Sequence, residues 1–248
     1  MDELFVSGIS LPEGYHNALA ALYEHGEISE CPDYNQKQKE CSMTIFISDP
    51  FREPMISKLF IGGHIDLEQY RQEVLDGILD FKIGQGWDYT YHDRIDSQMP
   101  FLLTELKRNP FSRRAVIDIR DWKEDTRHGN EGPACLQHMQ FFIRDGKLRL
   151  KVLMRSNDAA EATFMNMFAF IMLQERVAKT LGCEVGSYTH RANSFHCYEK
   201  DFGLLEAYMR GIRNQETITY DYEGFYAELM EESREEIAKK IATLRERE

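Results

Sequence analysis

The sequence predicts one α+β domain, in which a large β-sheet is packed by helices and one long helix is buried. Two segments and the chain length carry this prediction. The dipeptide Asp145-Gly146 between two strand-like runs indicates a β-hairpin, and the largely apolar stretch from Ala160 to Leu181 indicates the buried helix. The chain has 248 residues and no Ser/Gly/Pro-rich linker, which favours a single domain over residues 1–248.

Composition excludes several classes of protein. Hydrophobic residues make up 42% of the chain and charged residues 29%, and no apolar run approaches the ~20 residues of a membrane-spanning helix. The acidic start Met1-Asp2-Glu3-Leu4 lacks the pattern of a secretion signal. A net charge of −12 disfavours a nucleic-acid polymer, because such binding depends on neutralising phosphates. We therefore expect a cytoplasmic protein without a membrane partner, in which any anion site is local.

Residues 1–60 mix short apolar segments with polar loops, and only Ser42 to Ile47 has the clear pattern of a strand. A helix is expected from Asp66 to Leu79, where apolar residues recur at helical spacing and Asp66 can act as the cap. A second helix is expected from Gln98 to Lys107. It should end before Asn109, because the residue before a proline disfavours helical geometry.

The middle of the chain contains the predicted hairpin. Ala115 to Ile119 has the pattern of a strand, and the polar stretch from Lys123 to Gly132 that of a loop. The hairpin strands are Met139 to Ile143 and Leu148 to Met154, joined at Asp145-Gly146, where a two-residue turn needs positive φ.

After the hairpin comes the buried helix from Ala160 to Leu181, which Gly182 should end. Strand patterns follow at about Glu184 to His190 and at Ser194 to Tyr198, and then a helix to about Arg210. The last segment, about 224–248, is rich in charge, with acidic residues early and basic residues late. This order suits the helix dipole and predicts a solvated terminal helix.

Cys135 is the first candidate for chemistry. The five cysteines are odd in number and form no CxxC pair, which is typical of reduced thiols in a reducing compartment. Cys135 stands before an apolar strand, with Arg113-Arg114 preceding it and Arg155 at the end of the partner strand. Thiols near positive charge become nucleophiles, and arginines bind phosphate through paired hydrogen bonds. The pattern predicts covalent attack on a phosphorylated small molecule.

Five short motifs follow one another along the chain: Ser112-Arg113-Arg114, Pro133-Ala134-Cys135, Asp145-Gly146-Lys147-Leu148, Arg155-Ser156-Asn157-Asp158 with Asn166 beyond it, and His196-x-Tyr198. Each motif is weak alone, but their order and spacing together are specific. In this order they resemble the thymidylate synthase and pyrimidine nucleotide hydroxymethylase family over roughly residues 40 to 210. The resemblance implies a thymidylate synthase-like fold with a large mixed β-sheet.

The resemblance also implies a nucleotide site. Cys135 would be the thiolate that adds to C6 of a pyrimidine nucleoside monophosphate, as covalent catalysis by an activated thiol requires. Arg155 and Ser156 would hold the 5′-phosphate, while Arg113 and Arg114 resemble the pair that the partner subunit supplies. A homodimer with shared arginines would follow.

Further roles are carried over by the same resemblance. Asn166 would hydrogen-bond the edge of the base, and His196 and Tyr198 the sugar hydroxyl. Asp158 resembles the carboxylate that binds the pterin of 5,10-methylenetetrahydrofolate, the co-substrate. The spacing of His190, His196 and Cys197 matches no known metal site, so no metal is expected.

Two catalytic residues match by shorter motifs. Glu73, in Tyr70-Arg71-Gln72-Glu73, resembles the family's glutamate that organises water and proton transfer near the base. Tyr91 resembles the tyrosine that assists removal of the C5 proton. As alternatives, Glu73 could be an exposed helix residue, and Cys135 without the family context a buried structural thiol.

The expected reaction is transfer of a one-carbon unit to C5 of dUMP, giving dTMP. Asn166 favours uracil, because an amide can pair with the N3 donor and the O4 acceptor together, whereas the related deoxycytidylate hydroxymethylases carry Asp there. Amides can flip, however, so this argument leaves cytosine open. Hydroxymethylation through the same adduct is the first alternative, and nucleotide binding without turnover is the second.

Several residues depart from the usual family pattern. Leu136 follows the nucleophile where bacterial and animal members have His, and Ala162 replaces a glycine near the folate. No Arg-Thr-Gly-Thr-Gly-like phosphate loop occurs near the N-terminus, and Arg52 is a candidate substitute. The charged end replaces a short apolar tail that closes over the folate. These departures resemble a divergent branch found in archaea, some bacteria and phages.

Overall fold

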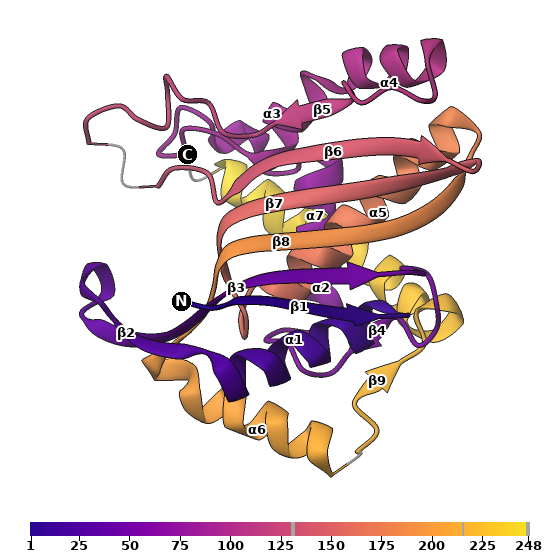
Figure 1. Cartoon of the computed structure of the whole chain (residues 1–248). Coiled ribbons are helices and arrows are strands. Elements are labelled where there is room, and N and C mark those ends of the chain that lie inside the picture. The colour runs from indigo at the N-terminus through magenta and orange to yellow at the C-terminus, as the bar shows by residue number, and fades with distance from the viewer. Residues whose placement is uncertain (130–131, 215, 247–248) are drawn as a thin grey trace.

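The computed structural model describes residues 1–129, 132–214 and 216–246, and its centre is a mixed seven-stranded sheet. The strand order is β1-β3-β8-β7-β6-β5, with β2 paired to the first half of β3 (Figure 1). In chain order its strands are β1 (Glu3–Gly8), β2 (Glu27–Cys31), β3 (Gln36–Ile47), β5 (Val116–Asp118), β6 (Leu136–Arg144), β7 (Lys147–Asp158) and β8 (Glu184–Tyr198). A separate two-stranded sheet joins β4 (Ile56–Ser57) to β9 (Thr219–Tyr220).

The predicted hairpin is confirmed as β6 and β7. The two strands pair antiparallel up to Arg144 and Lys147, and Asp145 and Gly146 adopt φ values of 55° and 73°. Both values lie in the left-handed region that a two-residue hairpin turn needs. β7 then pairs parallel with β8, which follows it through a crossover helix, so both strands end at the same edge of the sheet.

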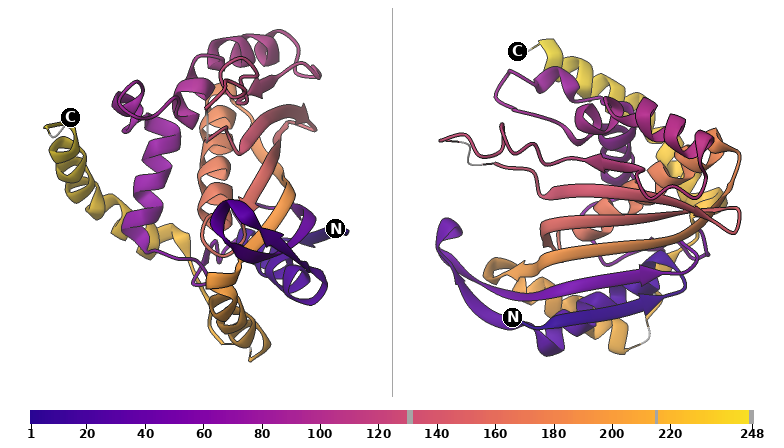
Figure 2. Two further views of the ribbon diagram at one scale, coloured as in Figure 1. Left: turned by 90° about the vertical axis from the view of Figure 1, so that its left-hand side faces the viewer. Right: turned by 45° about the horizontal axis from the view of Figure 1, so that its top comes forward.

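The helices lie in layers on one face of the sheet (Figures 1 and 2). Nearest the sheet is α5, then α2, then α7, while the opposite face carries no helix among the described residues (Figure 2, left). In chain order the helices are α1 (Leu11–His25), α2 (His64–Asp76), α3 (Tyr91–Asp96), α4 (Met99–Arg108), α5 (Thr163–Leu181), α6 (Phe202–Arg213) and α7 (Ala227–Glu246). This arrangement confirms an α+β fold with a mixed sheet packed by helices.

The long buried helix is confirmed as α5, although it begins at Thr163 rather than Ala160. Most of its side chains are buried, because it lies between the sheet and α2. The chain before it is held in a turn by Asp158, whose Oδ1 accepts hydrogen bonds from the amides of Ala160 and Glu161. Gly182 ends the helix with φ of 69°, the left-handed conformation that favours glycine.

The N-terminal region is more regular than the sequence predicts. Within residues 1–60, where only short apolar segments and polar loops are expected, Leu11–His25 forms α1. The Ser10 hydroxyl caps this helix by accepting from the amide of Glu13. β8 is likewise a single strand, although a break is expected after His190. Its backbone pairs with β3 and β7 on either side of His190, and the Arg191 guanidinium also donates to Ser42 and Thr44 on β3.

The charge pattern predicts a solvated terminal helix, but one side of α7 is buried. It buries Met230, Ile237 and Ile241, and it packs along α2. Residues 247 and 248 of the predicted helix, and residues 130 and 131 of the predicted loop, lie outside the described residues. Of the helices that the structure describes, none combines the length and apolarity needed to cross a bilayer.

Candidate active site

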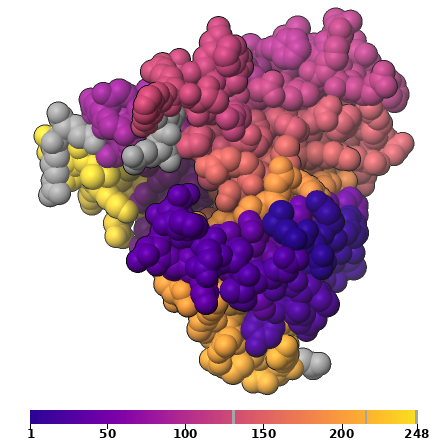
Figure 3. Space-filling model, turned by 60° about the vertical axis from the view of Figure 1, so that its left-hand side comes forward, coloured from indigo at the N-terminus to yellow at the C-terminus, as the bar shows by residue number. Residues whose placement is uncertain are grey.

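A cavity of about 730 Å³ lies where β7 and β8 end and β6 begins. In a space-filling view a recess opens beside the β2–β3 hairpin, on the side of the molecule where these strand ends meet (Figure 3). The cavity brings together most of the site residues that the sequence predicts. These are Tyr91, Cys135, Arg155, Ser156, Asp158, Asn166, His196 and Tyr198.

Backbone hydrogen bonds fix Cys135 next to Arg155. The amide of Arg155 donates to the carbonyl oxygen of Cys135 over 2.8 Å. The guanidinium of Arg155 donates to the carbonyl oxygens of Ala134 at 3.1 Å and Pro133 at 2.8 Å. A β-bulge between Leu136 and His138 interrupts the ladder directly after the thiol, and bulges commonly re-aim side chains near active sites.

The next residues of β7 face the end of β8. Ser156 pairs with Ser194 and Asp158 with His196 in the register of the two strands. The Ser156 hydroxyl lies 3.5 Å from Nδ1 of His196. Oδ1 of Asp158 is used in the turn before α5, and its Oδ2 makes no hydrogen bond to another described residue.

His196 has a buried atom without a partner. Its side chain is 4% exposed, and its Nε2 has no hydrogen-bond partner among the residues that the structure describes. Burial lowers the pKa of His196, although the negative charge of the Asp158 carboxylate acts to raise it. The ring is therefore neutral at neutral pH. Burial likewise raises the pKa of Asp158. Because buried polar atoms are normally hydrogen-bonded, Nε2 of His196 in this cavity wall indicates a polar ligand that bonds to it.

Asn166 projects from the first turns of α5. It is 6% exposed, and its Oδ1 accepts a short hydrogen bond from the hydroxyl of Tyr70 on α2. No described residue accepts from its Nδ2. The amide therefore keeps a free donor at the cavity wall.

Tyr91 lies against the segment that carries Cys135. Its hydroxyl accepts from the amide of Leu136 over 3.2 Å, one residue beyond Cys135. Burial raises the pKa of Tyr91 well above its ordinary value, with a further contribution from Cys135. The phenol therefore stays protonated at neutral pH and can orient a water or a substrate oxygen.

Glu73 lies in a second cavity of about 540 Å³, beside the first. Tyr70 and Tyr91 line both cavities, whereas Glu73 lines only the second. Its Oε1 accepts from Nε2 of Gln69 at 2.7 Å. Burial raises the pKa of Glu73, although the bond from Gln69 opposes this. Glu73 is thus a partly buried carboxylate, and it is not brought into the cavity that holds Cys135.

Arg113 and Arg114 are also outside the Cys135 cavity. Both are exposed, and Arg114 forms an ion pair with Glu105 at 3.0 Å while its own side chain remains 68% exposed. Arg52, the candidate substitute for a phosphate loop, is exposed and does not line the cavity either. Arg155 is therefore the one arginine or lysine among the described residues that line this cavity.

Comparison with known proteins decides the family. The thymidylate synthase family model matches residues 68–222. The chain belongs to the thymidylate synthase family. It is 31% identical over 208 residues to a protein of Methanocaldococcus jannaschii named "Putative thymidylate synthase", covering 80% of this chain and 93% of that protein. It is also 31% identical over 152 residues to the thymidylate synthase of Bacillus licheniformis, covering 60% of this chain and 53% of that protein.

The fold agrees with this family. The structure of the thermostable thymidylate synthase A of Bacillus subtilis matches with a TM-score of 0.63 at 18% identity, over 81% of this chain and 84% of that one. This likeness concerns the fold alone. Membership in the thymidylate synthase family identifies the chain as a transferase.

For this thymidylate synthase family member, sequence reasoning missed several residues that line the cavity, among them Tyr70 and Tyr34. Tyr70 lies one helical turn before Glu73, so the spacing on α2 alone could have nominated it. Tyr34 comes from the turn between β2 and β3, and its ring centroid lies 5.0 Å from that of Tyr198. No local motif marks Tyr34, because its place depends on how the hairpin folds over the sheet edge.

A group of carboxylates at the Cys135 cavity is the one set of described residues that could hold a metal ion. It comprises Asp158, Glu161 and Asp201. Lys200 donates to Glu161 at 2.9 Å and lies 3.5 Å from Asp201, so an ammonium already balances this charge. His190, considered above for a metal, is instead hydrogen-bonded to Tyr188 and Asn157.

Proposed function

We propose that the protein transfers a one-carbon unit from 5,10-methylenetetrahydrofolate to C5 of dUMP, through a covalent adduct between Cys135 and C6. One observation carries the proposal. A single cavity collects a thiol, a guanidinium, a base-edge amide and a neutral histidine with an orphan nitrogen: Cys135, Arg155, Asn166 and His196. These are the groups that a pyrimidine nucleoside monophosphate requires.

In the proposed reaction, Sγ of Cys135 forms a bond to C6 and the C5–C6 double bond opens. Electron density moves to C5 and O4, where the free Nδ2 donor of Asn166 stabilises it. C5 then forms its bond to the one-carbon unit as that carbon's bond to one folate nitrogen breaks. The C5 proton leaves to a water that the neutral hydroxyl of Tyr91 orients, and the carbon's bond to the second folate nitrogen breaks. Hydride from the folate then reduces the carbon to a methyl group while the C5–C6 double bond re-forms and Cys135 departs as a thiolate.

The second cavity fits the co-substrate. Trp87, Tyr89 and Leu79 give it aromatic and aliphatic walls for a flat pterin, and Glu73 supplies a polar group. Asp158 lines the neighbouring Cys135 cavity and has an unpaired carboxylate oxygen. When bound, the folate supplies the carbon and the hydride that reduces it to a methyl group.

A homodimer completes the phosphate site in this proposal. A nucleotide phosphate carries up to two negative charges, yet Arg155 shares its cavity with the carboxylates of Asp33 and Asp158. The exposed pair Arg113 and Arg114 would supply the missing charge from a second copy. The helix-free sheet face is suited to that copy, because it exposes apolar side chains such as Phe5, which is 67% exposed.

The test of this proposal is release of tritium from C5-labelled dUMP with methylenetetrahydrofolate present. The wild-type chain should release tritium, and Cys135→Ala should not. Cys183→Ala, which removes a thiol that lines neither cavity, is the matched control and should keep activity. Release by Cys135→Ala at a rate near that of wild type would contradict the covalent mechanism.

The mass of the product identifies the reaction. A methyl group on C5 with dihydrofolate formed supports the proposal. A hydroxymethyl group would show that water captures the same intermediate, which is the reaction of the pyrimidine hydroxymethylases. Nucleotide binding without tritium release would show that the protein binds the nucleotide without turnover and would contradict the proposed reaction.

A further inference from the structure

We propose that Tyr70 is a positioning residue that selects the base: its hydroxyl holds Oδ1 of Asn166, so the amide presents its Nδ2 donor to a carbonyl oxygen of the substrate. This inference rests on the proposed function, because it concerns how the same cavity distinguishes uracil from cytosine. It assigns a role to Tyr70, which sequence reasoning did not single out.

The first support is the contact itself. The hydroxyl of Tyr70 donates to Oδ1 of Asn166 in a short hydrogen bond that joins α2 to α5. Tyr70 lies at the boundary of the two cavities, and it contributes to both walls. Burial raises the pKa of Tyr70 well above its ordinary value, with smaller contributions from Tyr91 and Glu73. The phenol therefore keeps its proton and remains a donor.

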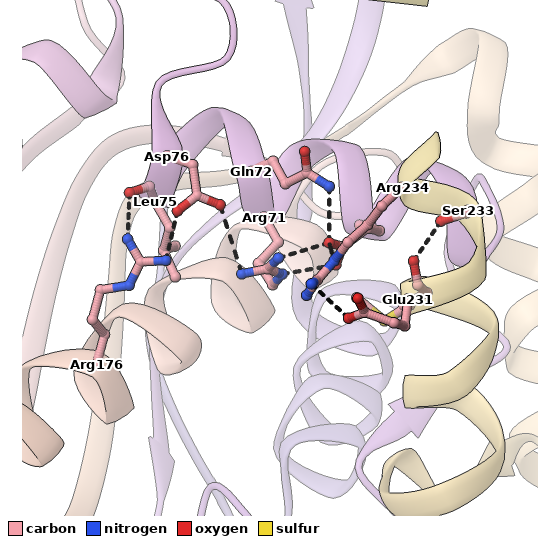
Figure 4. A network of polar contacts seen from close by, with 10 residues as sticks. Arg71, Gln72, Leu75, Asp76, Arg176, Glu231, Ser233 and Arg234 are labelled. Atoms are coloured by element: carbon pink, nitrogen blue, oxygen red, sulfur yellow. Dashed lines mark hydrogen bonds and ion pairs between the residues drawn. The ribbon is translucent and has the colours of Figure 1, made fainter. Parts of the chain in front are cut away.

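The second support is that α2 is held firmly. Figure 4 shows Arg71, Gln72 and Arg234 converging between α2 and α7. All three donate to the buried carboxylate of Glu68.

The end of α2 is tied to α5. Arg176 of α5 donates to the carbonyl oxygen of Leu75 at 2.5 Å and to Oδ1 of Asp76 at 2.6 Å. Asp76 also lies 3.9 Å from Arg71 (Figure 4). Because α2 is bonded to both neighbours, the Tyr70 hydroxyl has a fixed position relative to Asn166.

The consequence concerns the amide of Asn166. An asparagine side chain has an acceptor end and a donor end, and a half-turn exchanges them. With Oδ1 held by Tyr70, the donor end is left at the cavity, where it fits O4 of uracil. The amino group that cytosine carries at this place is itself a donor and would oppose it. A flipped amide could donate to the Tyr70 oxygen, but the buried O–H would then lose its only acceptor among the described residues. Tyr70 thus favours the orientation in which Nδ2 faces the cavity.

The inference can be tested with Tyr70→Phe, which removes one hydroxyl and keeps the ring. The dissociation constants of dUMP and dCMP are measured by calorimetry for wild type and variant, so the readout does not depend on turnover. Wild type should prefer dUMP. The preference should fall roughly three- to tenfold in Tyr70→Phe, since a lost hydrogen bond of ordinary strength no longer holds the amide.

Tyr222→Phe is the matched control. The ring of Tyr222 also packs on α5, 5.6 Å from that of Phe168, and it lines neither cavity. Its removal should leave the ratio of the two dissociation constants unchanged. If dUMP and dCMP lose affinity by the same factor in Tyr70→Phe, or neither loses affinity, Tyr70 is only a packing residue and the inference is wrong.

A second variant keeps the test independent of how Tyr70→Phe folds. Asn166→Asp retains an acceptor for the Tyr70 hydroxyl but offers the cavity no donor, so the preference should turn towards dCMP. An unchanged preference would overturn the inference. A wild-type chain that binds both nucleotides equally, yet releases tritium from dUMP, would overturn the inference alone. A wild-type chain that binds neither would contradict the proposed function.

Discussion

The amide of Arg155 donates to the carbonyl oxygen of Cys135 over 2.8 Å, so a main-chain hydrogen bond joins the candidate phosphate ligand to the candidate nucleophile. The guanidinium of Arg155 also donates to the carbonyl oxygens of Pro133 and Ala134. Two of its nitrogens therefore shape the segment that carries the thiol. The arginine both supplies charge and fixes geometry.

Replacing Arg155 by lysine should impair the reaction strongly. Lysine keeps the charge, but its ammonium cannot reproduce the planar donors that bond two carbonyl oxygens and a phosphate together. We expect kcat/KM for dUMP to fall roughly 10- to 100-fold, in line with the loss of charge-assisted hydrogen bonds. Steady-state kinetics of Arg155→Lys, with Arg213→Lys on the distant helix α6 as control, measure this. Activity near wild type would show that only charge is needed.

The proposed sharing of arginines predicts complementation between two inactive variants. Cys135→Ala lacks the thiol, and the double variant Arg113→Ala/Arg114→Ala lacks the arginines. Co-expressed as mixed dimers, they should regain roughly a quarter of wild-type activity, because half of the dimers carry one complete site. Each variant alone gives the background. If mixing restores nothing while mixed dimers are present, the arginines are not shared.

Removing the carboxylate of Glu68 should destabilise the fold. Burial would raise the pKa of Glu68, but hydrogen bonds from Arg71, Gln72 and Arg234 outweigh it and hold the pKa below its ordinary value. Glu68→Ala leaves Arg71, which is 11% exposed, without its main partner. We expect the free energy of unfolding to drop by about 3–5 kcal/mol.

Urea unfolding measures this change, and Glu231→Ala is its control. Glu231 also pairs with Arg234, at 2.5 Å, but it is 64% exposed, so its loss should cost less than about 1 kcal/mol. Equal effects of the two variants would show that burial does not strengthen the Glu68 network.

The lowered pKa of His16 predicts how the free energy of unfolding depends on pH. Burial lowers the pKa of His16 from 6.5 to about 4. Between those values the unfolded chain binds a proton that the folded chain does not, so stability should fall as pH falls from 6.5 towards 4. The slope for one such group is about 1.4 kcal/mol per pH unit. His190, with a pKa lowered to about 3 by burial, acts in the same direction.

His16→Asn should reduce this slope by the contribution of one proton, about 1.4 kcal/mol per pH unit, between pH 6.5 and 4. The variant also loses the contact between Nε2 of His16 and the Ser57 hydroxyl, so its absolute stability will change. The slope is therefore the informative quantity, measured by urea unfolding at several pH values. An unchanged slope would mean that His16 does not titrate differently in the folded and unfolded chain.

The sequence by itself determined the local geometry around the nucleophile. Asp145-Gly146 fixes a hairpin turn, which sets the register of β6 and β7 and so brings Arg155 to Cys135. The spacing from Asp158 to Asn166 also follows from local rules, because the Asp158 turn and the first turns of α5 separate them.

Only the tertiary structure decided which face of α2 reaches the site. Tyr70 and Glu73 are three residues apart on one helix, so periodicity cannot rank them. The rotation of α2 is set by packing on α5 and by the Glu68 contacts with α7, and it places Tyr70 against Asn166 and Glu73 in the neighbouring cavity. Tyr70 and Asn166 are 96 residues apart in the chain, and no local propensity encodes a contact that depends on how two helices pack.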